Sequence, residues 1–235
     1  MSQQIQNLDN FIVGKSNKLA YMAIKDKLDS NALGNFLILY GKSGTGKTHL
    51  LKAIENIYIE QDKNVVYATA ESFLNDFVKN VKMQTMSKFQ EKYRSCDLLL
   101  IDDIEYFKNK ENIQEEFYHT TKNIKANGGR IIMTSNRHPK KIGKIEEHLE
   151  AELLRVLSIK IKQPKKSLLI SFTKQKSDDA ELGLNKKTIE LIVESCDKNI
   201  NSIEGMILKL KAHSLLFEQS ISFKVAKKVL ADETI

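Results

Sequence analysis

Eight consecutive residues, 41–48, have the types and the spacing needed to bind phosphate groups. They read GKSGTGKT and directly follow the apolar run 36–40, so they fit the pattern G-x-x-x-x-G-K-[ST] in its expected setting. In such a loop backbone N–H groups bind the α- and β-phosphates, the lysine reaches the β- and γ-phosphates, and the last hydroxyl can bind Mg²⁺. We therefore expect Lys47 to bind phosphate and Thr48 to bind the metal ion.

Two adjacent carboxylates form a second candidate group. Asp102 and Asp103 follow the apolar run 98–101, and the end of a buried strand is where ATPases with this loop place their Mg²⁺-binding aspartate. We expect Asp102 to hold Mg²⁺ directly or through water, and Asp103 to orient or deprotonate the attacking water. Asn136, just after the run 131–135, is expected to touch the γ-phosphate or that water; a plain turn residue is the alternative.

The elements that must position these groups alternate along the chain. Short apolar, β-branched runs are separated by segments of helical period, and this alternation predicts a parallel sheet covered by helices on both faces. We expect the strands 36–40, 65–69, 98–101 and 131–135 to be buried on both sides. The segment after the loop, 49–59, has four apolar residues on one helical face, so the loop opens a helix whose N-terminus also favours anions. The predicted strands are 36–40, 65–69, 98–101, 131–135 and 157–161.

Beyond Pro164 the pattern becomes wholly helical. Four segments carry apolar stripes, at 165–178, 185–197, 201–217 and 222–230, and Asn201 with Glu204 is the predicted capping pair of the third. We therefore divide the chain into a nucleotide-binding αβα domain, 1–162, and a helical domain, 163–235.

Composition narrows the function further. The 37 basic and 30 acidic residues give a net charge of +7, which suits a polyanionic partner, but only four of the basic residues are arginines. Cys96 and Cys196 lack metal-ligand spacing, so neither a disulfide framework nor a zinc site is indicated. No apolar run reaches the roughly 20 residues of a membrane span, and the first ten residues do not read as a signal peptide. A cytoplasmic protein is expected.

Several motifs together give the chain a family resemblance. The stretches LDNFIVGKSN (8–17), FQEKYR (89–94) and QEEFYH (114–119), with the phosphate loop and the acids, resemble the AAA+ module of the DnaA family of bacterial replication initiators over nearly the whole chain. The resemblance implies a P-loop NTPase fold of the AAA+ type followed by a small all-α lid, with ATP or ADP and Mg²⁺ as cofactors. It places Ile12, Val13 and Asn17 against the adenine. The residues then expected to bind the nucleotide are Ile12, Val13, Asn17, Gly41, Ser43, Gly44, Thr45, Gly46, Lys47, Thr48 and His49.

The resemblance also implies a place for single-stranded DNA. The segment 73–94 would include the extra helix that distinguishes initiators and helicase loaders, with Val78 and Lys79 facing the strand and Lys82 beside them. An ordinary amphipathic core stripe is the alternative for Phe73, Phe77 and Val81 in the same segment.

Two departures from the family pattern bear on hydrolysis. Residues 147–153 read EHLEAEL where the family has Asp-Arg-Leu-x-Ser-Arg-Phe, so His148 and Glu152 replace the arginines of the trans-acting finger. Such a finger contributes about 10³ to 10⁵ in rate, and a glutamate facing a neighbour's γ-phosphate would repel it. Asn201 likewise replaces the family's sensor arginine, and Arg155 is the only nearby substitute. We expect weak or partner-dependent ATP hydrolysis and weak self-assembly.

The expected function is that of a DnaA-like ATP-binding switch in the initiation of bacterial DNA replication or its regulation. It would act through nucleotide-dependent contacts with DnaA, the helicase or the sliding clamp. One alternative is a helicase-loader-like ATPase that binds single-stranded DNA and the replicative helicase. Another is an excised AAA+ segment of a divergent initiator, lacking the N-terminal and helix-turn-helix domains. A small-molecule kinase is disfavoured, because residues 165–235 contain no arginine to clamp phosphates.

Overall fold

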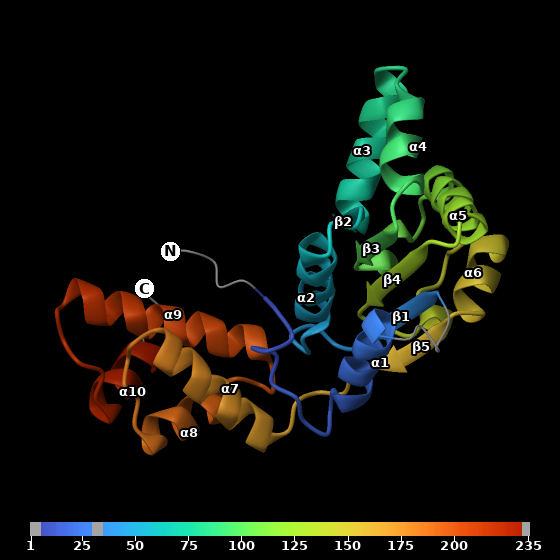
Figure 1. Cartoon of the computed structure of the whole chain (residues 1–235). Helices are drawn as coiled ribbons and strands as arrows, with labels where there is room; N and C mark the ends of the chain where they lie inside the picture. The colour runs from blue at the N-terminus through green and yellow to red at the C-terminus, as the bar shows by residue number, and fades with distance from the viewer. Residues whose placement is uncertain (1–5, 30–34, 232–235) are drawn as a thin grey trace. The chain divides into compact units, whose positions relative to one another are not determined.

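The chain folds into two compact units (Figure 1). The computed structural model describes residues 6–29 and 35–231. The described residues of the first unit are 6–11, 18–29, 35–42 and 47–161, and those of the second are 12–17, 43–46 and 162–231. Each unit has its own apolar core.

A five-stranded sheet organises the first unit, with all neighbouring strands parallel and in the order β2-β3-β4-β1-β5. The predicted strands are confirmed to within one residue at their ends. All five residues of β3 are buried, but only one residue of β2 and one of β5 is, because these two strands lie at the sheet edges. The predicted burial on both faces was therefore wrong for the edge strand β2. The strands are β1 (Phe36–Tyr40), β2 (Val65–Thr69), β3 (Leu98–Asp102), β4 (Arg130–Ser135) and β5 (Leu157–Lys160).

Helices cover both faces of this sheet, as predicted. Side chains alternate across a strand, so Leu99 and Ile101 of β3 join one core cluster while Leu98 and Leu100 join the other. The first cluster is covered by α3 (Ala70–Lys82), α4 (Met86–Arg94), α5 (Glu111–Ala126) and α6 (Glu147–Leu154), together with the short helices η1 (Ile104–Phe107) and η2 (Pro139–Lys141). The second is covered by α1 (Lys18–Asp29) and α2 (Lys47–Glu60).

An aromatic cluster anchors the two helices that lie side by side and extend away from the sheet, α3 and α4 (Figure 1). The ring of Phe73 on α3 lies 5.1 Å from Phe89 and 4.6 Å from Tyr93 on α4, both edge-on. It also contacts Phe107 of η1 and Phe117 of α5, at the base of the hairpin that α3 and α4 form. Such contacts add to the free energy of apolar burial, so the base of the hairpin is firmly attached to the first unit.

After residue 162, the regular secondary structure described in the second unit consists of helices alone. Its elements are α7 (Lys166–Asp179), α8 (Lys186–Ser195), α9 (Ile200–Leu216) and α10 (Phe223–Ala231), close to the four predicted helices. The predicted capping pair of α9 was wrong: the cap is Asn199, whose side chain accepts the N–H of Asn201 at 3.0 Å. Cys196 is a buried free thiol in this core, as Cys96 is in the first unit. None of the helices in the described part of the chain combines the length and hydropathy needed to span a bilayer.

Candidate functional site

The predicted phosphate loop connects β1 to α2. Gly44 and Gly46 have φ values of +69° and +92°, a backbone conformation that glycine adopts without the steric cost of a Cβ atom. The N–H of Gly41 donates to the carbonyl of Ser135 at 3.0 Å, which joins the start of the loop to the end of β4. Because α2 begins at Lys47, the N–H groups of its first turn have no partners within the helix and can bind an anion.

Lys47 is buried, with 5% of its surface exposed. Its Nζ donates to the carbonyls of Gly41 at 2.9 Å and Lys42 at 3.2 Å, and to Oδ1 of Asn136 at 2.8 Å. An ammonium group has three protons, so each has an acceptor in this structure. Two residues predicted from separate motifs, Lys47 and Asn136, thus meet in one hydrogen bond.

Asp102 is the most constrained acid of the site and is buried. Its Oδ2 accepts hydrogen bonds from Thr48 Oγ1 at 2.7 Å and from the hydroxyl of Tyr67 at 3.1 Å. Its Oδ1 accepts a short hydrogen bond from Thr134 Oγ1, which in turn accepts the N–H of Asp103 at 2.9 Å. Both acid positions are therefore held by one buried hydroxyl on β4.

The chemistry of these donors suits magnesium. Thr48 Oγ1 and Asp102 Oδ2 are hard oxygen ligands already in contact, and Mg²⁺ prefers one or two such ligands completed by water and phosphate oxygens. Within residues 6–29 and 35–231, no three His, Cys, Asp or Glu side chains group as a metal centre.

Burial and nearby charges shift the pKa values of Lys47 and Asp103 at this edge of the sheet. Burial lowers the pKa of Lys47, while the negative charges of Asp103, Glu105 and Asp102 act against that change. Burial, reinforced by the charges of Asp102 and Glu105, raises the pKa of Asp103 to about 6, although the residue keeps solvent-exposed surface. A carboxyl group that titrates near neutral pH is suited to accept a proton.

Sheet topology explains why these residues come together. Because β3, β4 and β1 are neighbours and parallel, their carboxyl ends meet at one edge, where the predicted residues Lys47, Thr48, Asp102, Asp103 and Asn136 all lie. Sequence reasoning missed three participants. The signals were a threonine inside the apolar run of β4, a tyrosine in β2, and a third acid two positions after the pair: Thr134, Tyr67 and Glu105.

The segment predicted to contact adenine is a tight turn in the second unit. Asn17 is buried, and its amide group donates to the carbonyl of Ile12 at 2.9 Å and accepts the N–H of Gly14 at 2.7 Å. Val13 is 42% exposed. Asn17 therefore shapes the turn, and the side chain of Val13 is exposed to solvent.

The other predicted nucleotide residues differ in exposure. Ser43 and Thr48 are exposed, whereas Thr45 is buried. The ring of His49 contacts the carbonyl of Asn7 through Nε2 at 3.0 Å, and it packs edge-on against Phe11 at 5.1 Å. The His49 side chain thus holds the N-terminal segment against α2.

Within the second unit, the loop residue Gly44 lies against the start of α9. Its carbonyl accepts the N–H of Ile200 at 3.3 Å, and a Cβ atom built on it would fall 1.8 Å from Oδ1 of Asn199. Only glycine fits this position. Asn201, which stands in place of the family's sensor arginine, is exposed at the same helix start.

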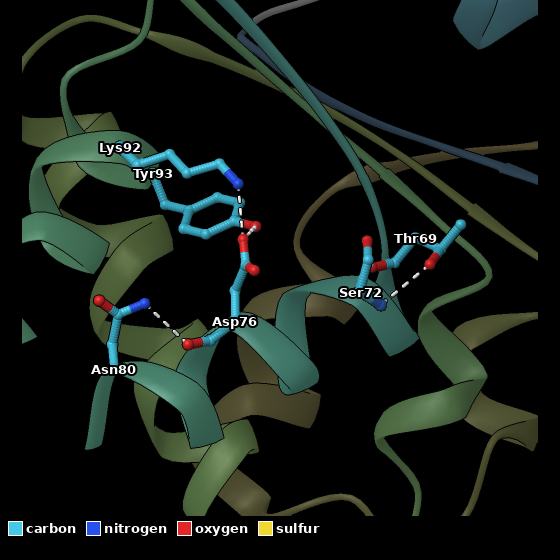
Figure 2. Close-up of polar contacts among 6 residues, drawn as sticks. All are labelled: Thr69, Ser72, Asp76, Asn80, Lys92 and Tyr93. Carbon is cyan, nitrogen blue, oxygen red and sulfur yellow. Dashed lines mark hydrogen bonds and ion pairs between the residues drawn. The ribbon is translucent and has the colours of Figure 1, made fainter. Parts of the chain in front are cut away.

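Polar contacts also tie α3 to α4 (Figure 2). Thr69 caps α3 by accepting the N–H of Ser72 at 3.0 Å. One turn further on, Oδ2 of Asp76 accepts hydrogen bonds from the hydroxyl of Tyr93 at 2.8 Å and from the ammonium of Lys92, both on α4. Hydrogen bonds from Lys92 and Tyr93 hold the pKa of Asp76 below its usual value, although burial acts in the opposite direction.

The residues predicted to bind DNA lie on the exposed part of α3. Val78 is 40% exposed, and Lys79 and Lys82 are exposed. The alternative of a core stripe is right for Phe73, which is fully buried, and for Phe77, which packs partly buried on the same cluster. Their neighbour Val81 is 49% exposed and does not belong to the core.

Glu152, in the place of a finger arginine, does not face outward. It is buried, and its carboxylate pairs with Lys122 and Lys125 of α5 at 3.3 Å each. The expectation that it would face a neighbour's γ-phosphate was therefore wrong: two lysines draw it into the first unit. His148 is exposed and packs edge-on against Tyr118, and Arg155 is exposed with its Nη1 4.0 Å from Glu152.

Comparisons with known sequences match the chain to one protein family. The profile of the family described as "Bacterial DnaA ATPAse domain" matches residues 3–160. The chromosomal replication initiator protein DnaA of Sulfurimonas denitrificans is 42% identical over 226 residues, which cover 96% of this chain and 52% of that protein. The chain thus spans about half the length of the curated relatives it matches.

Solved structures of the same family share the fold. Domain III of the Thermotoga maritima replication initiation protein DnaA has a TM-score of 0.92 at 30% identity, covering 98% of this chain and 97% of that one. A replication initiator DnaA solved with AMPPCP and single-stranded DNA has a TM-score of 0.81 at 33% identity, covering 91% and 68%.

Proposed function

Since the chain belongs to the bacterial DnaA ATPase-domain family, we propose that it binds ATP or ADP and acts as a nucleotide-dependent switch in the initiation of bacterial DNA replication. The observation that carries the proposal is the cluster at the carboxyl edge of the sheet. There Lys47 contacts Asn136, and Thr48 contacts Asp102, across separations of 89 and 54 residues. A surface turn would not bring a buried lysine, a metal-type oxygen pair and a carboxyl of raised pKa together.

Several residues predicted from the sequence have a proposed task. Backbone N–H groups of residues 41–46 and the Lys47 ammonium bind the phosphates, and Ile12, Val13 and Asn17 form the adenine side. Thr48 and Asp102 would hold Mg²⁺, which when bound neutralises phosphate charge. Asp103 takes the proton of the attacking water. The remaining predicted contacts are Ser43, Gly44, Thr45, Gly46 and His49.

The rest of the proposal concerns organisation and partners. We assign residues 1–162 to the nucleotide-binding domain and 163–235 to a helical lid. Because both finger positions lack arginine, hydrolysis is slow unless a partner supplies that charge. The partners are other replication proteins, namely DnaA, the helicase or the sliding clamp.

Thermal unfolding with and without Mg-ATP tests nucleotide binding. A ligand at 100 times its dissociation constant adds about 2.7 kcal/mol to the free energy of unfolding, so a clear rise of Tm is expected with either ATP or ADP. In Lys47→Ala the rise is lost, whereas Lys63→Ala, a change at an exposed lysine outside the loop, keeps it. An unchanged Tm of the wild-type protein at saturating nucleotide would refute the proposal.

Single-stranded DNA binding is a second candidate function, favoured by the exposed lysines on α3. We propose weak binding that does not depend on base sequence and is strengthened by ATP. Two or three lysine contacts predict a log-log salt slope of about −1.4 to −2.1, at roughly 0.7 per phosphate neutralised. Fluorescence anisotropy with a labelled oligonucleotide measures this slope. Lys79→Ala and Lys82→Ala should each make the slope less steep, whereas the matched control Lys224→Ala on α10 should leave it unchanged. If binding is unchanged in both α3 variants, this surface does not bind DNA.

A further inference from the structure

Glu105 lies in the site without an assigned role. It belongs to η1, three residues after Asp102, and its Oε1 accepts the backbone N–H of Asn136 at 3.1 Å. Its Oε2 is buried and has no hydrogen-bond partner among the described residues. A half-satisfied buried carboxylate is unfavourable by itself, so the arrangement calls for an explanation beyond packing.

The contact continues from Glu105 to the phosphate loop. The backbone N–H of Asn136 donates to Glu105, and the side-chain Oδ1 of Asn136 accepts a hydrogen bond from Lys47 at 2.8 Å. Asn136 therefore connects the acid on η1 with the ammonium group at the start of α2. The negative charge of Glu105 also acts on Lys47 and counteracts the effect of burial on its charged state.

The geometry around Lys47 identifies which contact a phosphate would replace. All three ammonium protons already have acceptors, so a phosphate oxygen must displace one of them. Two acceptors are backbone carbonyls of the loop itself. The third is the Asn136 side chain, which can rotate away while its backbone stays in place.

We propose that Glu105 is a positioning residue that fixes the backbone of Asn136. With its backbone held, the Asn136 side chain can leave Lys47 and contact the terminal phosphate of ATP. The inference rests on the proposed nucleotide-binding function. It assigns Glu105 no contact with the nucleotide. A carboxylate is required only as a hydrogen-bond acceptor, so glutamine at position 105 should serve nearly as well.

Nucleotide affinity gives the first test, with ATP and ADP titrated by calorimetry. Glu105→Ala should weaken ATP binding about tenfold and ADP binding less than about threefold, as expected for loss of one hydrogen bond that supports a terminal-phosphate contact. Glu105→Gln should stay within about threefold of wild type for both. The matched control is Glu60→Ala, at the exposed end of α2.

A double-mutant cycle separates positioning from general destabilisation. If Glu105 acts through Asn136, then Glu105→Ala should have no further effect on ATP affinity in an Asn136→Ala background. Additive losses, equal weakening of ATP and ADP, or a glutamine variant as weak as the alanine variant would each overturn the proposal.

Hydrogen exchange of the nucleotide-free protein gives a reading that does not depend on binding. Glu105→Ala should speed exchange of the Asn136 amide about tenfold, while the Gly41 amide, held by Ser135, keeps its protection. Unchanged exchange at Asn136 would overturn the positioning role. If the wild-type protein bound neither nucleotide, the proposed function would fail, and exchange at Asn136 would still decide the role of Glu105.

Discussion

At the scale of single residues, one hydroxyl controls both acids of the candidate site. Thr134 is fully buried on β4; it donates to Asp102 Oδ1 and accepts the N–H of Asp103. These bonds orient the carboxylate that would hold a metal ion and fix the left-handed backbone of Asp103, whose φ is 58°. Thr134 thus links the strand that precedes Asn136 to the strand that carries the acids.

Removing this hydroxyl without changing the side chain's shape should lower the stability of the fold. In Thr134→Val, the buried carboxylate of Asp102 and the N–H of Asp103 lose a partner, so we expect the free energy of unfolding to fall by about 2 kcal/mol. Thr134→Ser keeps the hydroxyl and should lose only about 1 kcal/mol, from the missing methyl group. Chemical denaturation measures both. Equal losses in the two variants would show that packing, and not the hydroxyl, matters at this position.

At the scale of elements, the α3–α4 hairpin depends on a polar clamp as well as on its aromatic base. The Asp76 carboxylate joins the two helices through Tyr93 and Lys92 (Figure 2). Beyond this clamp lies the exposed part of α3 that carries the proposed DNA-binding lysines. We therefore expect the clamp to restrict movement of that surface.

The clamp predicts a pH-dependent contribution to stability. The pKa of Asp76 is lowered in the folded chain, so its stabilisation is present above the unfolded pKa of about 3.9 and is lost as pH falls through the lower folded value. Asp76→Asn should reduce the free energy of unfolding at pH 7 by about 1 kcal/mol, since the pair is partly exposed. The difference from wild type should shrink below about pH 4. Denaturation at several pH values, with the exposed Asp179→Asn as control, checks this; a pH-independent difference would contradict it.

At the scale of the whole molecule, the departures at α6 bear on the proposed weak self-assembly. Where the family places two finger arginines, this chain has an exposed histidine, His148, and a buried glutamate, Glu152. Neither presents a guanidinium group to a neighbouring copy. Burial opposes ionisation of Glu152, but hydrogen bonds from Lys125 and Lys122 together with their charges keep its pKa below the usual value. Glu152 therefore has a structural role, through its ion pairs with Lys122 and Lys125.

We therefore expect neither ATP-driven homo-assembly nor appreciable ATPase activity of the protein alone. Light scattering and phosphate release at micromolar protein concentrations measure these properties. Reintroducing an arginine by Glu152→Arg should not restore activity. It would bury a cation beside Lys122 and Lys125, at a cost of about 3 to 5 kcal/mol. Robust turnover of the wild-type chain that disappears in Arg155→Ala would show instead that Arg155 is a relocated finger.

The sequence by itself determined the features that depend on short spacing along the chain. The eight-residue loop, the acid pair after β3 and the alternation of strands and helices are local patterns, because phosphate binding and element formation are decided by neighbours in sequence. The parallel sheet covered on both faces and the helical second unit followed from these patterns. The cap of α9 did not: two asparagines two residues apart offer the same chemistry, and only the backbone at Asn199 decides between them.

Tertiary structure decided which distant residues meet. Asn136 reaches Lys47 across 89 residues, and Thr134 reaches Asp102 across 32, because β4 pairs with both β1 and β3. The order of strands in a sheet depends on packing of whole layers and leaves no mark in the local pattern of one strand. For the same reason the sequence could not reveal that Glu152 turns inward, since its two lysine partners lie on another helix.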